Sequence, residues 1–288
     1  MKRMMAVALA LFLVAWSGPA LAGPVMLSGH DADDHGFQSV YAGLFNNLLS
    51  NVTNGGSGIL AIGTTSGTTA GLWISGVASL MSTPQAVTFV DGAAAISAQS
   101  FAGFGIIHVV SDSNNTSGGI IQTELTALNL RSADVATHIN SGGGLFGLTL
   151  DGLTDRYNYL GAIGAVTDLA IPPSGLFPSG DLYDNLNATA AGAALGITNT
   201  NLDGCCWHNV FTSFPTFMNV LATANAPLDP AFNGQASIIG GSNVTITQCG
   251  GPNQAPCPTT SAVPEPASFL LFGSGLAGLA VWRVRKKV

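Results

Sequence analysis

The 288-residue chain is 47% hydrophobic and only 8% charged. Between Gly23 and Pro264 only two basic residues, Arg131 and Arg156, stand against fourteen carboxylates, a formal charge of −12. Because basic side chains are needed to neutralise phosphates, this composition excludes a nucleic-acid partner and disfavours anionic lipid or anionic polysaccharide. Cations, neutral glycans and proteins are the partner classes that remain.

The start of the chain has the three parts of a cleavable secretory signal. Lys2 and Arg3 precede an apolar run over residues 4–16, and an Ala-x-Ala sequence ends the segment. The sequence therefore predicts a signal peptide over residues 1–22 and export through the Sec machinery. The exported domain is predicted to span residues 23–248.

The exported region begins with an alternation of short apolar runs and amphipathic segments. Strands are predicted at residues 24–27, 59–63, 86–90, 104–110 and 145–150, and helices at residues 37–49 and 120–139. Apolar strands that alternate with amphipathic helices favour a parallel sheet covered on both faces. The predicted fold class is α/β, a three-layer sandwich with a mostly parallel sheet.

Four polar residues, His30, Asp31, Asp33 and Asp34, directly follow the first predicted strand. In open α/β sheets, ligands collect at the C-terminal ends of the strands. The further side chains expected at this edge are Asp91, Asp112 and His138. Hard cations prefer oxygen ligands, so Asp31, Asp33 and Asp34 are candidate Ca²⁺ ligands, although the loop lacks the Gly and Glu of an EF-hand. The alternative is that Asp33 or Asp34 caps the following helix, where carboxylates are favoured.

Three features between residues 104 and 150 have simple structural interpretations. His108 lies within an apolar strand and is predicted to be a buried, hydrogen-bonded core histidine. His138 lies near a helix C-terminus, where the helix dipole favours a cation. The glycines at 142–144 are predicted to end that helix.

The helix and the run Gly-Gly-Gly-Leu-Phe-Gly-Leu-Thr within residues 138–149 resemble class I glutamine amidotransferase-like domains. The resemblance covers about residues 24–220 and implies an α/β fold. Where those enzymes carry a nucleophilic Cys this chain has Thr149, and no Cys occurs before Cys205, so the resemblance implies the fold without the glutaminase reaction. The late histidine of the family would correspond to His208. A Ser nucleophile paired with His208 stays open, although there is no Gly-x-Ser-x-Gly elbow.

The late part of the exported region contains all four cysteines. The elements predicted there are a loop at 172–180, helices at 184–195 and 216–224, and a strand or hairpin at 236–248. An even number of cysteines in an oxidising compartment predicts disulfides, and we favour bonds from Cys205 and Cys206 to Cys249 and Cys257, in either pairing. A zinc site that includes His208 is the alternative, although the spacing fits no common Cys-x-x-Cys pattern.

The last twenty-six residues follow a predicted flexible linker over residues 249–262. Val263-Pro264-Glu265-Pro266 is predicted to be stiff and extended, and four basic residues end the chain after an uncharged run. That run, residues 267–282, would span roughly 24 Å as a helix, so a single transmembrane helix with a cytoplasmic basic end is predicted.

This order of parts resembles the PEP-CTERM sorting tail of exported Gram-negative proteins. The resemblance implies cleavage by an exosortase, a membrane protease found in bacteria that make exopolysaccharide. The protein would then pass through an inner-membrane intermediate to the cell surface or the extracellular space. An ordinary C-terminal membrane anchor is the alternative, but it leaves Pro264-Glu265-Pro266 unexplained.

Two functions are compatible with these features. The first is a non-enzymatic envelope or extracellular-matrix protein whose α/β domain binds a cation, an extracellular polysaccharide or a surface protein. The second is a hydrolase of unknown substrate that uses His30, Asp31 and His208 at the C-terminal edge of the sheet. The low charge and the missing nucleophile favour the first.

Overall fold

The computed structural model describes residues 22–161, 166–170, 186–198, 207–215, 218–225, 230–242 and 244. The strands in these residues are β1 (Val25–Ser28), β2 (Ile59–Ile62), β3 (Val87–Val90), β4 (Ile106–Val109), β5 (Gly144–Gly147), β6 (Thr167–Ala170), β7 (Leu186–Ala188), β8 (Asn209–Ser213), β9 (Asn219–Ala224) and β10 (Ala236–Gly241). The helices are α2 (Ala32–His35), α3 (Gln38–Ser50), α4 (Thr69–Leu80), α5 (Ala93–Ala98), α6 (Gln122–Asn129), α7 (Ser132–Asn140) and α8 (Ala190–Ala194), with one 3₁₀ turn, η1 (Asn158–Leu160).

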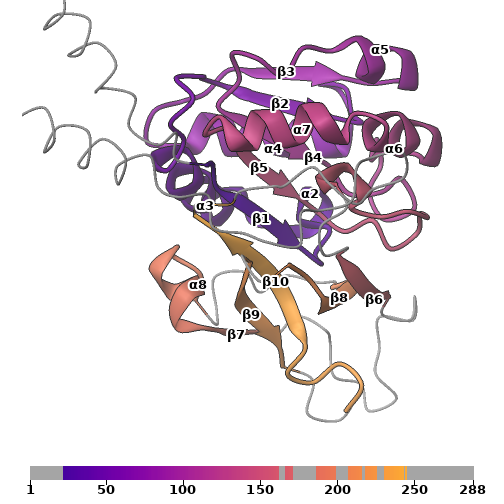
Figure 1. Cartoon of the computed structure of the whole chain (residues 1–288). Helices are drawn as coiled ribbons and strands as arrows, with labels where there is room; N and C mark the ends of the chain where they lie inside the picture. The colour runs from indigo at the N-terminus through magenta and orange to yellow at the C-terminus, as the bar shows by residue number, and fades with distance from the viewer. Residues whose placement is uncertain are drawn as a thin grey trace, which may run out of the picture.

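The first five strands form the parallel half of a single sheet, in the order β3-β2-β4-β5-β1 (Figure 1). All five were predicted from their apolar runs, and the structure confirms them. Four of them are buried along their whole length, whereas β3, at the edge, is partly exposed. Burial on both faces explains why their sequences are continuously apolar rather than alternating.

Alternate residues of these strands supply two separate cores. Met26, Ile59 and Phe146 belong to the core that α3 and α4 cover. Val25, Leu60 and Leu145 belong to the core on the opposite face, which α5, α6 and α7 cover. The parallel half is therefore a three-layer α/β sandwich, as predicted.

The other half of the sheet is antiparallel. Residues 238–241 of β10 pair with the whole of β1, β8 and β9 both pair with β10, and β6 and β7 pair with β8 and β9 respectively. Figure 1 shows this half as a mainly strand-built part below the helix-covered half. The sheet is thus mixed, and the prediction of a mostly parallel sheet describes only the part from β1 to β5.

One helix prediction in the later chain was wrong, and another was only partly right. Residues 219–224 form β9, whose Ala222 and Val220 pair with Ile238 and Ile239 of β10. Residues 184–195 were predicted as one helix, but within the described residues they divide into β7 and the short α8. Pairing with β10 decides the structure of β9, since its short sequence has no strong local preference.

The predicted helix over residues 120–139 is two helices that meet at Leu130 and Arg131. Arg131 is the N-cap of α7, and its guanidinium donates hydrogen bonds to the carbonyl oxygens of Ile96 and Gln99. The same group lies 4.3 Å from the ring centre of Phe101 and its Nε lies 2.9 Å from Asp134 Oδ2. These contacts tie α7 to the segment after α5 and account for the break.

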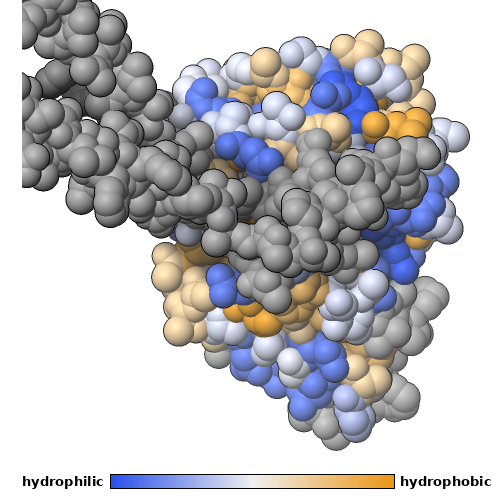
Figure 2. All heavy atoms as spheres, viewed as in Figure 1, coloured by the Kyte–Doolittle hydropathy of each residue, from blue (hydrophilic) through white to orange (hydrophobic). Residues whose placement is uncertain are grey.

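No helix among the described residues is long and apolar enough to cross a bilayer. The signal peptide, the loop at 172–180, the four cysteines, the linker and the predicted transmembrane helix at 267–282 lie outside those residues, apart from Ala22. On the face shown in Figure 2, polar and apolar residues of the described part are intermixed. Among the residues that the structure describes, the most exposed large apolar side chain is Leu130, at 83%.

His108 is a buried core histidine, as predicted. Its side chain is fully buried in β4, and Nδ1 lies 3.1 Å from the carbonyl oxygen of Phe146. The ring stacks on the Phe146 ring, with centres 5.6 Å apart, and meets the Phe45 ring edge-on. Burial lowers the pKa of His108 to about 4, because a charged imidazole would lose its hydration there.

We expect this histidine to make the domain acid-sensitive. The unfolded chain takes up the proton below pH 6.5 while folded His108 stays neutral, so stability present above pH 6.5 is lost as the pH falls towards 4, by up to roughly 3 kcal/mol. Urea unfolding of the wild type and of His108→Leu at pH 7 and pH 4.5 measures the effect. The loss of stability on acidification should be smaller in His108→Leu, and an equal loss in both proteins would contradict this assignment.

Candidate functional site

Charged side chains gather where β1, β4 and β5 end, next to the start of β8. We call this group the edge cluster, and its members are His30, Asp31, Asp34, His35, Asp112, Asp151 and His208. Backbone hydrogen bonds hold the four segments together. The amide of His208 donates to Gly29 O (2.8 Å), that of Thr149 to His30 O (3.2 Å) and that of Asp112 to Thr149 O (3.1 Å).

Asp31 lies at the centre of the edge cluster and is 1% exposed. Its Oδ2 is 3.1 Å from His208 Nε2 and 3.7 Å from His35 Nε2, and its Oδ1 is 3.8 Å from His30 Nε2. His30 is itself placed by a 2.8 Å hydrogen bond between its Nδ1 and Tyr41 OH, and by stacking on Trp207. One buried carboxylate is thus surrounded by three imidazoles. Two of them, His30 and His208, were predicted from the sequence to lie with Asp31.

His208 lies between two carboxylates. Its Nε2 faces Asp31, and its Nδ1 is 4.0 Å from Asp151 Oδ2. Burial of the ring opposes protonation, but the hydrogen bond and charge of Asp31, together with the charges of Asp151 and Asp112, raise the pKa of His208 above its ordinary value. The carboxylates near the ring thus outweigh the effect of its burial.

Asp112 and Asp151 are two neighbouring carboxylates of the edge cluster. The Asn115 side-chain amide donates to both, at 2.8 Å to Asp112 Oδ2 and 2.5 Å to Asp151 Oδ1. Burial, with the nearby charge of Asp151, raises the pKa of Asp112, although the backbone amides of Asn114 and Gly152 act in the opposite direction. Asp112 was predicted at this edge from the sequence, whereas Asp151, four residues after β5, was not.

Asp33 does not face the edge cluster. Its carboxylate accepts hydrogen bonds from Ser111 N (3.0 Å), Ser111 Oγ (2.5 Å) and Thr116 Oγ1 (3.0 Å), and burial raises its pKa to about 6. The carboxylates of Asp31, Asp33 and Asp34 are therefore not assembled as a set. Nor does Asp33 or Asp34 cap the helix after them, because the N-cap of α3 is Phe37, which makes no side-chain cap hydrogen bond.

Two other residues predicted at this edge lie outside the edge cluster. Asp91 directly follows β3, so it does lie at the C-terminal edge of the parallel strands, but β2 and β4 separate β3 from β5 and β1. Asp91 interacts with Glu124, whose Oε1 accepts a hydrogen bond from Gly92 N. His138 lies at the opposite end of β5, with Nε2 3.2 Å from the carbonyl oxygen of Gly144, the first residue of that strand. Burial lowers the pKa of His138, so the expected cationic form is not favoured.

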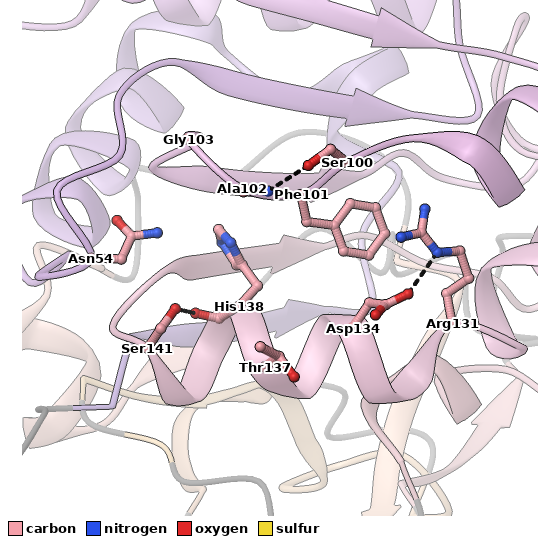
Figure 3. Close-up of a pocket in the computed structure, with 10 residues that line it drawn as sticks. All are labelled: Asn54, Ser100, Phe101, Ala102, Gly103, Arg131, Asp134, Thr137, His138 and Ser141. Carbon is pink, nitrogen blue, oxygen red and sulfur yellow. Dashed lines mark hydrogen bonds and ion pairs between the residues drawn. The ribbon is translucent and has the colours of Figure 1, made fainter.

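His138 lines a surface cavity of about 360 Å³ between α7 and the loop before β4 (Figure 3). Asp134 and His138 project from α7 towards that loop, which contributes Ser100 and Phe101. Arg131, on the same wall, is already bound to Asp134 and to carbonyl oxygens. Arg131 and Asp134 of this cavity are thus paired with each other.

Thr149 is the residue that the predicted amidotransferase-like resemblance would set at the position of the nucleophile. It is fully buried, and its hydroxyl donates a 2.6 Å hydrogen bond to Asn209 Oδ1. Asn209 in turn donates to Tyr157 OH at 3.2 Å. The hydroxyl is therefore committed to joining β5 to β8.

Comparison with known families identifies the C-terminal tail. Residues 262–286 match the family model of the PEP-CTERM protein-sorting motif, which confirms the predicted tail. The motif includes Val263, Pro264, Glu265 and Pro266. It marks a protein that is exported through the membrane to the cell surface or extracellular space and sorted by an exosortase. No curated protein and no solved structure matches the chain, so the resemblance to amidotransferase-like domains stays a prediction.

Proposed function

We propose that the exported α/β domain is a non-catalytic binding or structural protein of the extracellular matrix, associated with exopolysaccharide. The tail motif implies sorting by an exosortase, and this sorting supports a location outside the cell. The observation that carries the non-catalytic part is the placement of His208, whose two ring nitrogens both face carboxylates.

A histidine that acts as a general base needs one ring nitrogen directed at the nucleophile. His208 directs Nε2 at Asp31 and Nδ1 at Asp151. The hydroxyl of Thr149 is engaged by Asn209. This geometry supports a structural ion-pair network that joins the two halves of the sheet.

The second candidate is a secreted hydrolase of unknown substrate that uses His30, Asp31 and His208. The observation in its favour is the 3.1 Å contact between Asp31 and His208, which are far apart in the sequence. A carboxylate beside a histidine is part of many hydrolase sites. It would need the His208 ring to turn one nitrogen away from its carboxylate and towards a nucleophile.

A replacement of His208 separates the two candidates. We expect His208→Gln, expressed in cells that lack the native gene, to restore the mass of extracellular matrix to the wild-type amount, because the polar amide of Gln can still lie against Asp31 in place of the imidazole. Asp134→Asn, which changes a carboxylate 56% exposed on α7, is the matched control. Loss of the matrix with His208→Gln, while the secreted protein is folded and as abundant as the control, would favour the hydrolase.

A further inference from the structure

We propose that Asp31, Asp34 and His35 form a binding site for a divalent transition-metal ion such as Zn²⁺. The three residues come from one helical turn, at positions i, i+3 and i+4, and therefore share one face of α2. Trp73 Nε1 holds that turn against α4 by donating to Gly36 O at 2.8 Å. The site goes beyond the proposed function and does not depend on it.

The spacing of the donor atoms fits a single bound cation. His35 Nε2 is 3.0 Å from Asp34 Oδ2 and 3.7 Å from Asp31 Oδ2, and one donor atom from each residue can be chosen with all three within 4.8 Å. Donor atoms about 2.1 Å from a tetrahedral Zn²⁺ are roughly 3.4 Å apart. Both distances from His35 Nε2 are close to this value, so the three side chains can converge on one ion.

A second observation concerns Asp31 alone. Its Oδ1 is buried and accepts no hydrogen bond from the residues that the structure describes. The imidazole nitrogen of His30, at 3.8 Å, is beyond hydrogen-bonding distance. A buried carboxylate oxygen without a donor is costly, and a bound cation would offset that cost. Oδ2, the oxygen that faces His35, is also 3.1 Å from His208 Nε2, and this contact would orient the carboxylate in the way that outer partners orient metal ligands.

The composition of the site selects the class of metal. An imidazole nitrogen together with two carboxylates suits zinc and related transition metals, whereas Ca²⁺ is bound by oxygen ligands alone. The side chains of Asp34 and His35 are 32% and 41% exposed, so water can reach the ion and complete its coordination. The carboxylate of Asp33, the third ligand in the Ca²⁺ hypothesis, instead accepts hydrogen bonds from the hydroxyls of Ser111 and Thr116.

The test is a calorimetric titration of the purified full chain with Zn²⁺ after removal of bound metals by a chelator, followed by thermal unfolding. We expect one-site binding and a higher melting temperature in the wild type. In Asp34→Asn/His35→Gln we expect binding weaker by about tenfold or more, with an unchanged melting temperature in the metal-free state because both side chains are partly exposed.

Asp134→Asn, which removes one exposed carboxylate from α7, should bind Zn²⁺ like the wild type. The proposed site would be overturned if millimolar Zn²⁺ gave neither a heat of binding nor a higher melting temperature. It would also be overturned if the double variant bound Zn²⁺ as tightly as the wild type. A parallel titration with Ca²⁺ tests the class of metal, and a response to Ca²⁺ as strong as that to Zn²⁺ would overturn it.

Discussion

Replacement of Pro264, Glu265 and Pro266 by alanine will leave the chain uncut and retained in the membrane fraction. These residues lie within the matched sorting motif, directly before the apolar run. Two prolines in three residues are expected to keep the backbone extended and accessible to a protease, whereas three alanines would allow the predicted apolar helix to extend through them. We expect processing to fall from complete to undetectable, as measured by intact mass and fractionation of cells that contain the exosortase.

The control is an equally large change immediately outside the motif. Thr259, Thr260 and Ser261, replaced together by alanine, precede the matched residues and should be processed like the wild type. Cells without the exosortase should retain the uncut wild-type chain. A wild-type chain that stays uncut in both kinds of cell would reduce the tail to a membrane anchor and remove the main support for a matrix protein.

Gly29→Ala will destabilise the domain by about 3 kcal/mol or more. Gly29 directly follows β1, where its amide donates to Ser237 O at 3.0 Å and its carbonyl oxygen accepts from His208 N at 2.8 Å. A Cβ atom at this position would lie 1.9 Å from the carbonyl oxygen of Asn209, so the backbones of the two halves of the sheet would have to separate. The contact between Asp31 and His208 would be strained by the same movement.

Gly43→Ala is the matched control, because it adds the same methyl group at an exposed position of α3. A Cβ atom at Gly43 meets nothing within 4 Å, and alanine is the better helix former by up to about 1 kcal/mol. Urea unfolding should therefore show a large loss of stability for Gly29→Ala and a small gain for Gly43→Ala. Similar values for the two variants would mean that the halves of the sheet are not packed as closely as the structure indicates.

The parallel half could be predicted because each of its strands can be recognised from its own short stretch of sequence. Strands such as β2 and β4 are buried on both faces, which leaves short apolar runs between helices that are easy to recognise. The antiparallel half depends on pairing between distant segments. β9 has a sequence compatible with a helix and becomes a strand because β10 lies beside it.

Members of the edge cluster that follow the end of a strand, such as Asp31 and Asp112, could be predicted from the sequence. Members whose position depends on the direction in which a side chain points were not predicted. The segment after β1 was treated as a loop, but Asp31 is the N-cap of the helical turn α2. Successive residues of a helix point about 100° apart, so Asp34 and His35 share the face of Asp31 while Asp33 points into the core. His138 was misplaced for a topological reason, since a helix that precedes a parallel strand ends at the N-terminal edge of the sheet.

The two arginines of the exported domain have a practical consequence for finding the protein among secreted proteins. Trypsin, which cuts after Lys and Arg, has only Arg131 and Arg156 to act on between residues 23 and 264, and each is engaged by hydrogen bonds or a carboxylate. Complete digestion would still leave the peptides 23–131 and 157–264 or longer, each over one hundred residues. Standard tryptic mass spectrometry of culture medium will therefore under-report this protein, whereas cleavage at its fourteen carboxylates would reveal it.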